Sequence, residues 1–65
     1  MALKNHLKAL RTTSGYTQEE LGNRVGVSRQ TIISIERYRY KPSLELAMKL
    51  CRELDVAVED VFYFE

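Results

Sequence analysis

Apolar residues recur at helical spacing at the start of this 65-residue chain. Leu3, Leu7 and Leu10 fall on one face of a helix, which predicts a first amphipathic helix over residues 2–13. Ser14-Gly15 ends this helix, because glycine readily takes the left-handed conformation found at helix ends. The pattern therefore predicts that the chain begins as a helix.

A capping box predicts where the second helix begins. In Thr17-Gln18-Glu19-Glu20 the threonine hydroxyl can accept a free backbone N–H, and the Glu20 carboxylate can reach back to the start of the helix. Leu21 and Val25 form the buried side of this helix. Gly26 ends it after about two turns.

A third helix follows closely, capped by Ser28 and with Ile32 and Ile35 facing inward. Two short helices joined by a glycine-containing turn form a helix-turn-helix, here over residues 17–37. Gly22 supports this interpretation, because a small residue admits the close approach of the third helix. Gly26 can take the positive φ that the tight turn requires.

The rest of the chain is predicted to form two more helices. Tyr38 to Lys41 is a polar, aromatic connection, and Pro42-Ser43 starts a fourth helix. A short fifth helix is predicted over Val58 to Phe62, whereas Phe62-Tyr63-Phe64 has the composition of a strand and fits either structure. The pattern predicts an all-α fold of five helices in one domain, residues 1–65. The inward positions of the fourth helix are Ala47, Leu50, Cys51 and Leu54.

The outward side of the third helix carries the candidate chemistry. Arg29 and Gln30 occupy its first turn, the end that enters the DNA major groove in this motif. Arginine pairs with guanine and glutamine with adenine through two hydrogen bonds each. Ile33 either contacts a thymine methyl group or is partly covered by the second helix. The predicted base-contacting residues are Arg29, Gln30, Ile33 and Ser34.

A second set of residues is predicted to hold DNA phosphates. Gln18 lies at the start of the second helix, where free N–H groups and the helix dipole attract anions. A basic stretch with tyrosines follows the third helix, and such side chains bind phosphate by charge and hydroxyl groups. The alternative to phosphate binding for Tyr38 and Tyr40 is that their rings pack over the rim of the core. The predicted phosphate-contacting residues are Gln18, Ser28, Thr31, Arg37, Arg39, Tyr40 and Lys41.

Charge is unevenly distributed along the chain although it sums to +1. Residues 1–41 hold eight basic and three acidic side chains, a net charge of +5, and residues 42–65 hold two basic and six acidic ones, a net charge of −4. The basic part favours a polyanionic partner and the acidic part a solvated face or a protein contact. The alternative explanation is that the uneven distribution of charge arose by chance, as it often does in so short a chain.

Composition excludes several classes of protein. Cys51 has no second cysteine to pair with, which excludes a disulfide scaffold. No apolar run approaches the roughly 18 residues of a membrane span, so we expect a cytoplasmic protein, and DNA binding would make it nucleoid-associated. His6 is the single histidine and is expected on the surface, and neither a metal-spaced cluster nor a nucleophile–base pair is present. We therefore expect no enzyme activity, no cofactor and no metal.

A resemblance to a known family rests on three runs: Arg11-x-x-x-Gly15-x-Thr17-Gln18-Glu19-Glu20-Leu21, then Gly26-Val27-Ser28-Arg29-Gln30-Thr31-Ile32, then Ile35-Glu36. With Lys41-Pro42-Ser43-Leu44-Glu45-Leu46-Ala47 and Val61-Phe62, they resemble the Cro and phage-repressor-like (Xre) helix-turn-helix regulators. The resemblance implies a compact lambda-repressor-like five-helix bundle that binds operator DNA as a homodimer. It also implies a structural ion pair between Arg11 and Glu36.

Two positions depart from the family pattern. Tyr38 stands where glycine usually ends the third helix in a left-handed conformation, so this helix is expected to end differently. Ala57 stands where a serine often caps the last helix, so that helix is expected to fray.

Dimerisation would let the protein read two half-sites about 34 Å apart. The predicted dimer contact is made by Tyr63 and Phe64, with Phe62 in the core, and the alternative for Phe64 and Glu65 is a disordered tail.

The sequence thus predicts a transcriptional regulator, expected to be a repressor, that binds palindromic double-stranded DNA. The alternative is an antitoxin or anti-regulator that acts as a protein-interaction module and binds a protein partner.

Overall fold

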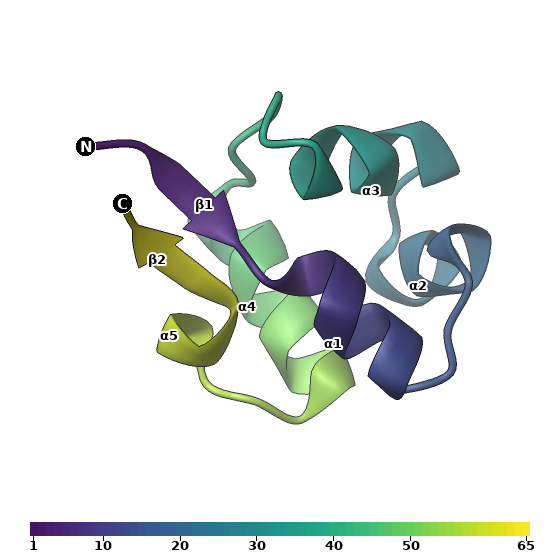
Figure 1. Cartoon of the computed structure of the whole chain (residues 1–65). Helices are drawn as coiled ribbons and strands as arrows, with labels where there is room; N and C mark the ends of the chain where they lie inside the picture. The colour runs from purple at the N-terminus through teal and green to yellow at the C-terminus, as the bar shows by residue number, and fades with distance from the viewer.

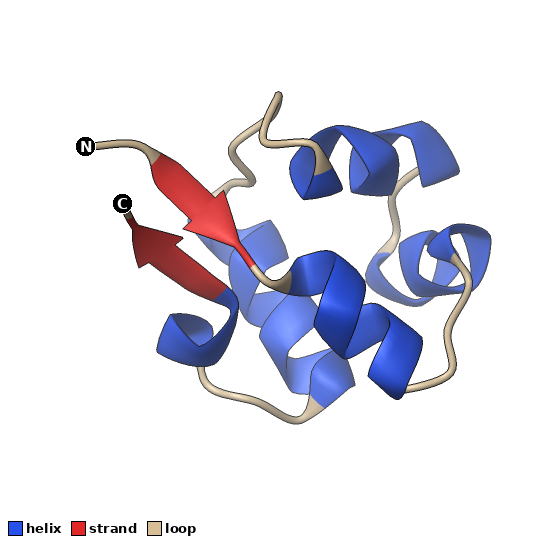
Figure 2. Ribbon diagram, viewed as in Figure 1, coloured by secondary structure: helices blue, strands red, loops and turns tan.

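Five helices pack around one apolar core, and a small antiparallel sheet joins the two ends of the chain (Figure 1, Figure 2). The computed structural model describes residues 1–65. Figure 1 shows α2 and α3 at one end of the molecule and the sheet at the other. The elements in chain order are β1 (Leu3–Asn5), α1 (Leu7–Thr13), α2 (Gln18–Val25), α3 (Arg29–Glu36), α4 (Leu44–Leu54), α5 (Val58–Val61) and β2 (Phe62–Phe64).

The core takes residues from every helix, as the apolar pattern predicts. The buried positions of α4 face α2 and α5, so α4 lies against both of them. Cys51 is 4% exposed and packs as a small core residue, as predicted. None of the helices has the length and apolar character of a membrane span. The buried cluster consists of Leu7, Leu21, Val25, Ile32, Ile35, Leu46, Leu50, Cys51, Leu54 and Val61.

The N-terminal residues form a strand, so the predicted helix over residues 2–13 is wrong before Leu7. β1 pairs with β2 antiparallel, with Leu3 opposite Phe64 and Asn5 opposite Phe62. The pairing gives both segments backbone hydrogen bonds that neither can make alone. The five helices are confirmed, and the all-α class is corrected to a mainly helical fold with one small sheet.

The end of the chain is ordered by the same sheet. Beyond the paired residues, Glu65 donates its backbone N–H to the carbonyl of Ala2 at 2.9 Å and accepts the N–H of Ala2 at 3.0 Å. Its carboxylate also accepts a hydrogen bond from Lys4 Nζ at 2.8 Å. The alternative of a disordered tail at Phe64 and Glu65 is therefore wrong.

The end of α3 differs from what the tyrosine at position 38 predicts. Tyr38 takes the left-handed conformation (φ 62°) despite its side chain. Its N–H donates to the carbonyl of Ile35 at 3.0 Å, and the N–H of Arg39 donates to the carbonyl of Ser34 at 2.9 Å. These two bonds form a Schellman motif, the ending usually associated with glycine. The helix therefore ends as glycine would end it.

The last helix, α5, is a single turn. Ala57 supplies no side-chain cap, as predicted, and the Asp60 carboxylate instead accepts the backbone N–H of Ala57 at 3.0 Å. Phe62 leaves the helix for the strand, so α5 ends one residue before the predicted boundary.

Candidate nucleic-acid interface

The start of α2 has the predicted capping box. The hydroxyl of Thr17 accepts the backbone N–H of Glu20 at 3.0 Å, and the Glu20 carboxylate accepts the N–H of Thr17 at 2.9 Å. Hydrogen bonding to the Glu20 carboxylate, first from the Thr17 backbone N–H and then from its side chain, lowers the pKa of Glu20 because it favours the ionised form. The capping box fixes where α2 begins and therefore where Gln18 projects.

The turn between α2 and α3 depends on two glycines. Gly26 has φ 79°, as predicted. A Cβ atom at Gly22 would lie 2.7 Å from the carbonyl oxygen of Val27, which is far inside normal contact. The close approach at Gly22 is made by the backbone of the turn at Val27 and Ser28, rather than by the body of α3. These two glycines set how α3 crosses α2.

The third helix presents its first turn to solvent. Ser28 caps it by accepting the N–H of Thr31 at 3.2 Å, so the helix begins at Arg29 as the sequence predicts. The side chains of Arg29 and Gln30 are exposed. Farther along the same helix, Ile33 is half-buried, which agrees with partial covering. Thr31 and Ser34 are half-buried as well.

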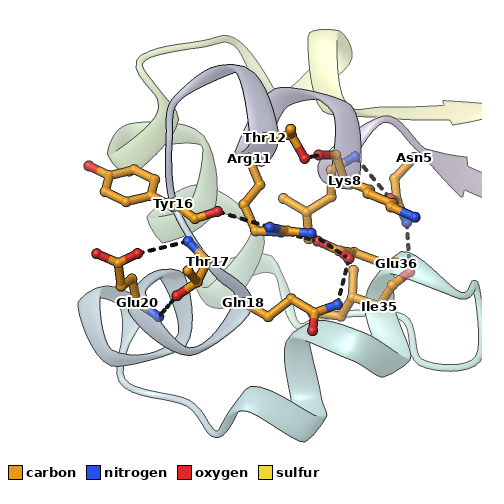
Figure 3. A network of polar contacts seen from close by, with 11 residues as sticks. Asn5, Lys8, Arg11, Thr12, Tyr16, Thr17, Gln18, Glu20, Ile35 and Glu36 are labelled. Atoms are coloured by element: carbon orange, nitrogen blue, oxygen red, sulfur yellow. Dashed lines mark hydrogen bonds and ion pairs between the residues drawn. The ribbon is translucent and has the colours of Figure 1, made fainter.

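A buried ion pair ties α1 to the end of α3 (Figure 3). Arg11 Nε donates to Glu36 Oε2 at 2.6 Å and Arg11 Nη2 to Glu36 Oε1 at 3.3 Å. The third guanidinium nitrogen, Nη1, donates to the carbonyl of Tyr16 at 2.9 Å. The two side chains are only 11% and 4% exposed. The pair therefore has the structural role that the family resemblance implies.

Gln18 joins this network from the start of α2. Its Nε2 atom donates to Glu36 Oε1 at 3.1 Å, so one amide hydrogen is used inside the protein (Figure 3). An open hollow of about 720 Å³ lies beside it and is lined by both Gln18 and Arg29. The structure thus places one predicted phosphate-contacting residue and one predicted base-contacting residue along the same hollow.

Unpaired positive charges concentrate around α3. Of the ten lysines and arginines, four are in ion pairs with carboxylates: Lys4, Arg11, Arg24 and Lys49. Four of the other six lie on α3 or in the segment Arg37 to Lys41, which we call the basic loop. These four are Arg29, Arg37, Arg39 and Lys41, and all of them are exposed. Lys8 on α1 and Arg52 on α4 are the remaining two.

Asn5 is a contributor that sequence reasoning missed. Its side-chain Nδ2 donates to the carbonyl of Ile35 at 2.9 Å, and its Oδ1 accepts the N–H of Leu7 at 3.0 Å. Asn5 therefore connects β1 to the last turn of α3 and also satisfies the start of α1. No local signal identifies it, since its position depends on strand pairing with residues near the other end of the chain.

The predicted dimer contact divides between the two faces of β2. Tyr63 is half-buried and stacks on His6, with ring centroids 4.5 Å apart. Phe64 is 65% exposed and borders an apolar hollow of about 480 Å³, and Phe62 packs against the core as predicted. The apolar hollow is lined by Leu3, Pro42, Leu44, Ala47, Val58, Glu59, Phe62 and Phe64.

The family model described as helix-turn-helix matches residues 7–61. The chain belongs to the Cro-like (Xre) helix-turn-helix family of DNA-binding transcriptional regulators. It is 51% identical to the HTH-type transcriptional regulator YgzD of Bacillus subtilis over 63 residues, covering 97% of this chain and 96% of the relative. A regulator of Methanocaldococcus jannaschii is 49% identical with the same coverage.

A solved structure agrees with this assignment. The restriction-modification controller protein C.AhdI from Aeromonas hydrophila superimposes with a TM-score of 0.77 at 33% sequence identity, covering 83% of this chain and 78% of the controller. A more distant relative is the antitoxin HipB of Escherichia coli, 34% identical over 59 residues, with 75% of this chain and 67% of HipB covered. The resemblance to the Xre family is thus confirmed.

Proposed function

We propose that this helix-turn-helix regulator binds a specific DNA operator by placing α3 in the major groove. The observation that carries the proposal is the exposure of Arg29 and Gln30 at the start of α3, beside the unpaired cations of the basic loop. Arg29 would pair with guanine and Gln30 with adenine. Ile33 and Ser34, which are half-buried, would contact base edges at the rim of this surface.

Phosphate contacts would flank the bases on both sides. The second N–H of the Gln18 amide is available for a phosphate, since only one is used by Glu36. Ser28 and Thr31 lie at the start of α3, and the basic loop contributes Arg37, Arg39, Tyr40 and Lys41, all exposed. Such contacts fix the register of the protein on the duplex without reading sequence.

A selection from a random DNA pool, followed by fluorescence anisotropy, tests this proposal. Arg29→Ala should cost about 1–3 kcal/mol and relax the choice at one base pair. Lys41→Ala should weaken binding to all sequences and reduce the salt slope by about one. Arg52→Ala is the matched control, because Arg52 is an unpaired cation on α4. Selected DNA whose binding ignores both salt and Arg29→Ala would contradict the proposal.

We also propose that two copies bind a palindromic operator, with Phe64 and the apolar hollow forming the contact. Exposed Phe64 beside an apolar hollow supports an association surface. Occupation of the operator by the dimer would repress transcription by blocking the DNA. Sedimentation should show a wild-type dimer and a Phe64→Ser monomer that still binds a single half-site. A monomeric wild-type protein on a palindrome would contradict it.

A second candidate function is protein interaction, as in an antitoxin. It is favoured by the identity to HipB together with the acidic balance of residues 42–65. This function predicts a stable complex with the product of a neighbouring gene. Co-expression of the two genes followed by size-exclusion chromatography tests it, and separate elution of the two proteins would count against it.

A further inference from the structure

Tyr38 is held in a backbone conformation that its side chain disfavours. At φ 62° it lies in the left-handed region, at the position of the Schellman motif that glycine normally fills. Bulky residues are uncommon there because the Cβ atom crowds the backbone. A strained residue persists only where the surrounding structure holds it, and such strain is associated with functional sites.

The Tyr38 side chain contacts β1 in two ways. Its hydroxyl donates to the backbone carbonyl of Asn5 at 3.4 Å, and Lys4 Nζ lies 5.7 Å from the centre of its ring. Asn5 in turn donates its side-chain amide to the carbonyl of Ile35 at 2.9 Å. Two hydrogen bonds therefore join strand β1 to the end of α3: the Tyr38 side chain donates to the backbone of β1, and the Asn5 side chain donates to the backbone of α3.

This connection lies at the start of the basic loop. Arg37 precedes Tyr38 and Arg39 follows it, and both arginines are exposed without a carboxylate partner. No other side chain of the loop is hydrogen-bonded to the rest of the protein. Its position relative to α3 thus depends on the Schellman bonds and on what the Tyr38 side chain contacts.

We propose that Tyr38 is a positioning residue for DNA binding, which fastens the basic loop to β1 so that its cations are ordered before they meet phosphate. The inference rests on the proposed function. Ordering the loop in advance reduces the conformational entropy lost on binding. A glycine at position 38 would relieve the backbone strain but release the loop, so stability and DNA affinity would respond differently.

The test compares Tyr38→Gly with the wild-type protein in three measurements: urea unfolding, NMR order parameters of the backbone at residues 39–41, and affinity for the selected operator. We expect an unfolding midpoint close to that of the wild type, lower order parameters, and DNA affinity reduced about threefold to tenfold with base choice unchanged. Tyr38→Phe keeps the ring and the strain, and should lose less affinity.

Asp55→Gly is the matched control. Asp55 is the other non-glycine residue with positive φ (56°) and ends α4, so glycine there relieves similar strain without touching the basic loop. It should leave DNA affinity unchanged. Unchanged order parameters in Tyr38→Gly, or a looser loop with wild-type affinity, would overturn the inference. If Tyr38→Gly fails to fold, equal affinity of Tyr38→Phe, Tyr38→Asn and wild type would overturn it. Failure of the wild-type protein to bind any selected DNA would instead show that the proposed function is wrong.

Discussion

Arg11 and Glu36 form a two-point ion pair, with Nε and Oε2 2.6 Å apart, that joins α1 to the end of α3. The side chains are 11% and 4% exposed, so neither charge is well solvated. Gln18 donates to the same carboxylate, and the Tyr16 carbonyl accepts from the same guanidinium. The candidate interface therefore depends on a largely buried polar network in which no buried side-chain nitrogen or oxygen lacks a partner.

Breaking this pair should strongly destabilise the fold. Arg11→Ala leaves the Glu36 carboxylate buried without a cation, and the free energy of unfolding should fall by about 3–5 kcal/mol. Replacing both residues, as Arg11→Met with Glu36→Leu, should restore part of the loss, because no charge is then left unpaired but the Tyr16 carbonyl and the Gln18 amide each lose a partner. Urea unfolding followed by circular dichroism measures the effect. Lys49→Ala, which breaks the exposed pair with Glu45, is the control and should cost at most about 1 kcal/mol. Equal losses for the two alanine variants would refute the argument.

Gly22→Ala should destabilise the protein although alanine is the better helix former. The added Cβ atom would meet the Val27 carbonyl oxygen at 2.7 Å, and backbone cannot yield as a flexible side chain can. We expect the free energy of unfolding to fall by about 1–3 kcal/mol. Asn23→Ala, at the exposed neighbouring position, should raise it by a few tenths of a kcal/mol through helix propensity. A stabilised Gly22→Ala variant would show that the turn is not closely packed.

Stability should depend on pH through Glu20. Hydrogen bonds from Thr17 lower its pKa in the folded protein below the usual 4.5. Its contribution is therefore complete above pH 4.5 and is lost as the pH falls through the lower, folded-state pKa. Glu20→Gln keeps a capping side chain that does not titrate. Between neutral pH and about pH 3, the unfolding temperature of the wild type should fall by more than that of Glu20→Gln. A difference that stays constant with pH would contradict the prediction.

Cys51 should report on opening of the core. The side chain is 4% exposed, and burial raises the pKa of its thiol. Because the thiolate is the reactive form, a thiol reagent at about pH 8 should modify the native protein at least about a hundredfold more slowly than the urea-unfolded chain. The rate should rise in Gly22→Ala by about tenfold for each 1.4 kcal/mol of stability lost, because it follows the population of the opened state. Rapid modification of the native wild-type protein would show that α4 is not packed as described.

Local sequence signals predicted the helices and the turn between α2 and α3. The Thr17 and Ser28 caps and the positive φ of Gly26 lie where the sequence predicts. Each of these features depends on residues within one or two helical turns of one another, so the chain itself carries the information. Exposure of Arg29 and Gln30 followed from the same helical periodicity.

The strand over Leu3–Asn5 was not predictable in this way, because Leu3 and Leu7 also fit one face of a helix. Three residues are too few to separate the two periods. Pairing with Phe62–Phe64, almost sixty residues away in sequence, decided the structure by supplying backbone partners. The same pairing positions Asn5 to meet Ile35 and Tyr38.

The sequence by itself determined the five helices, their caps and the outward side of α3, since caps and apolar periodicity act over a few neighbouring residues. The tertiary structure alone decided that the two ends of the chain form a sheet and that Tyr38 adopts a left-handed conformation against β1. The sheet and the contact of the Tyr38 side chain with Asn5 join residues more than thirty positions apart, which no local pattern encodes, whereas the Schellman bonds that end α3 are local.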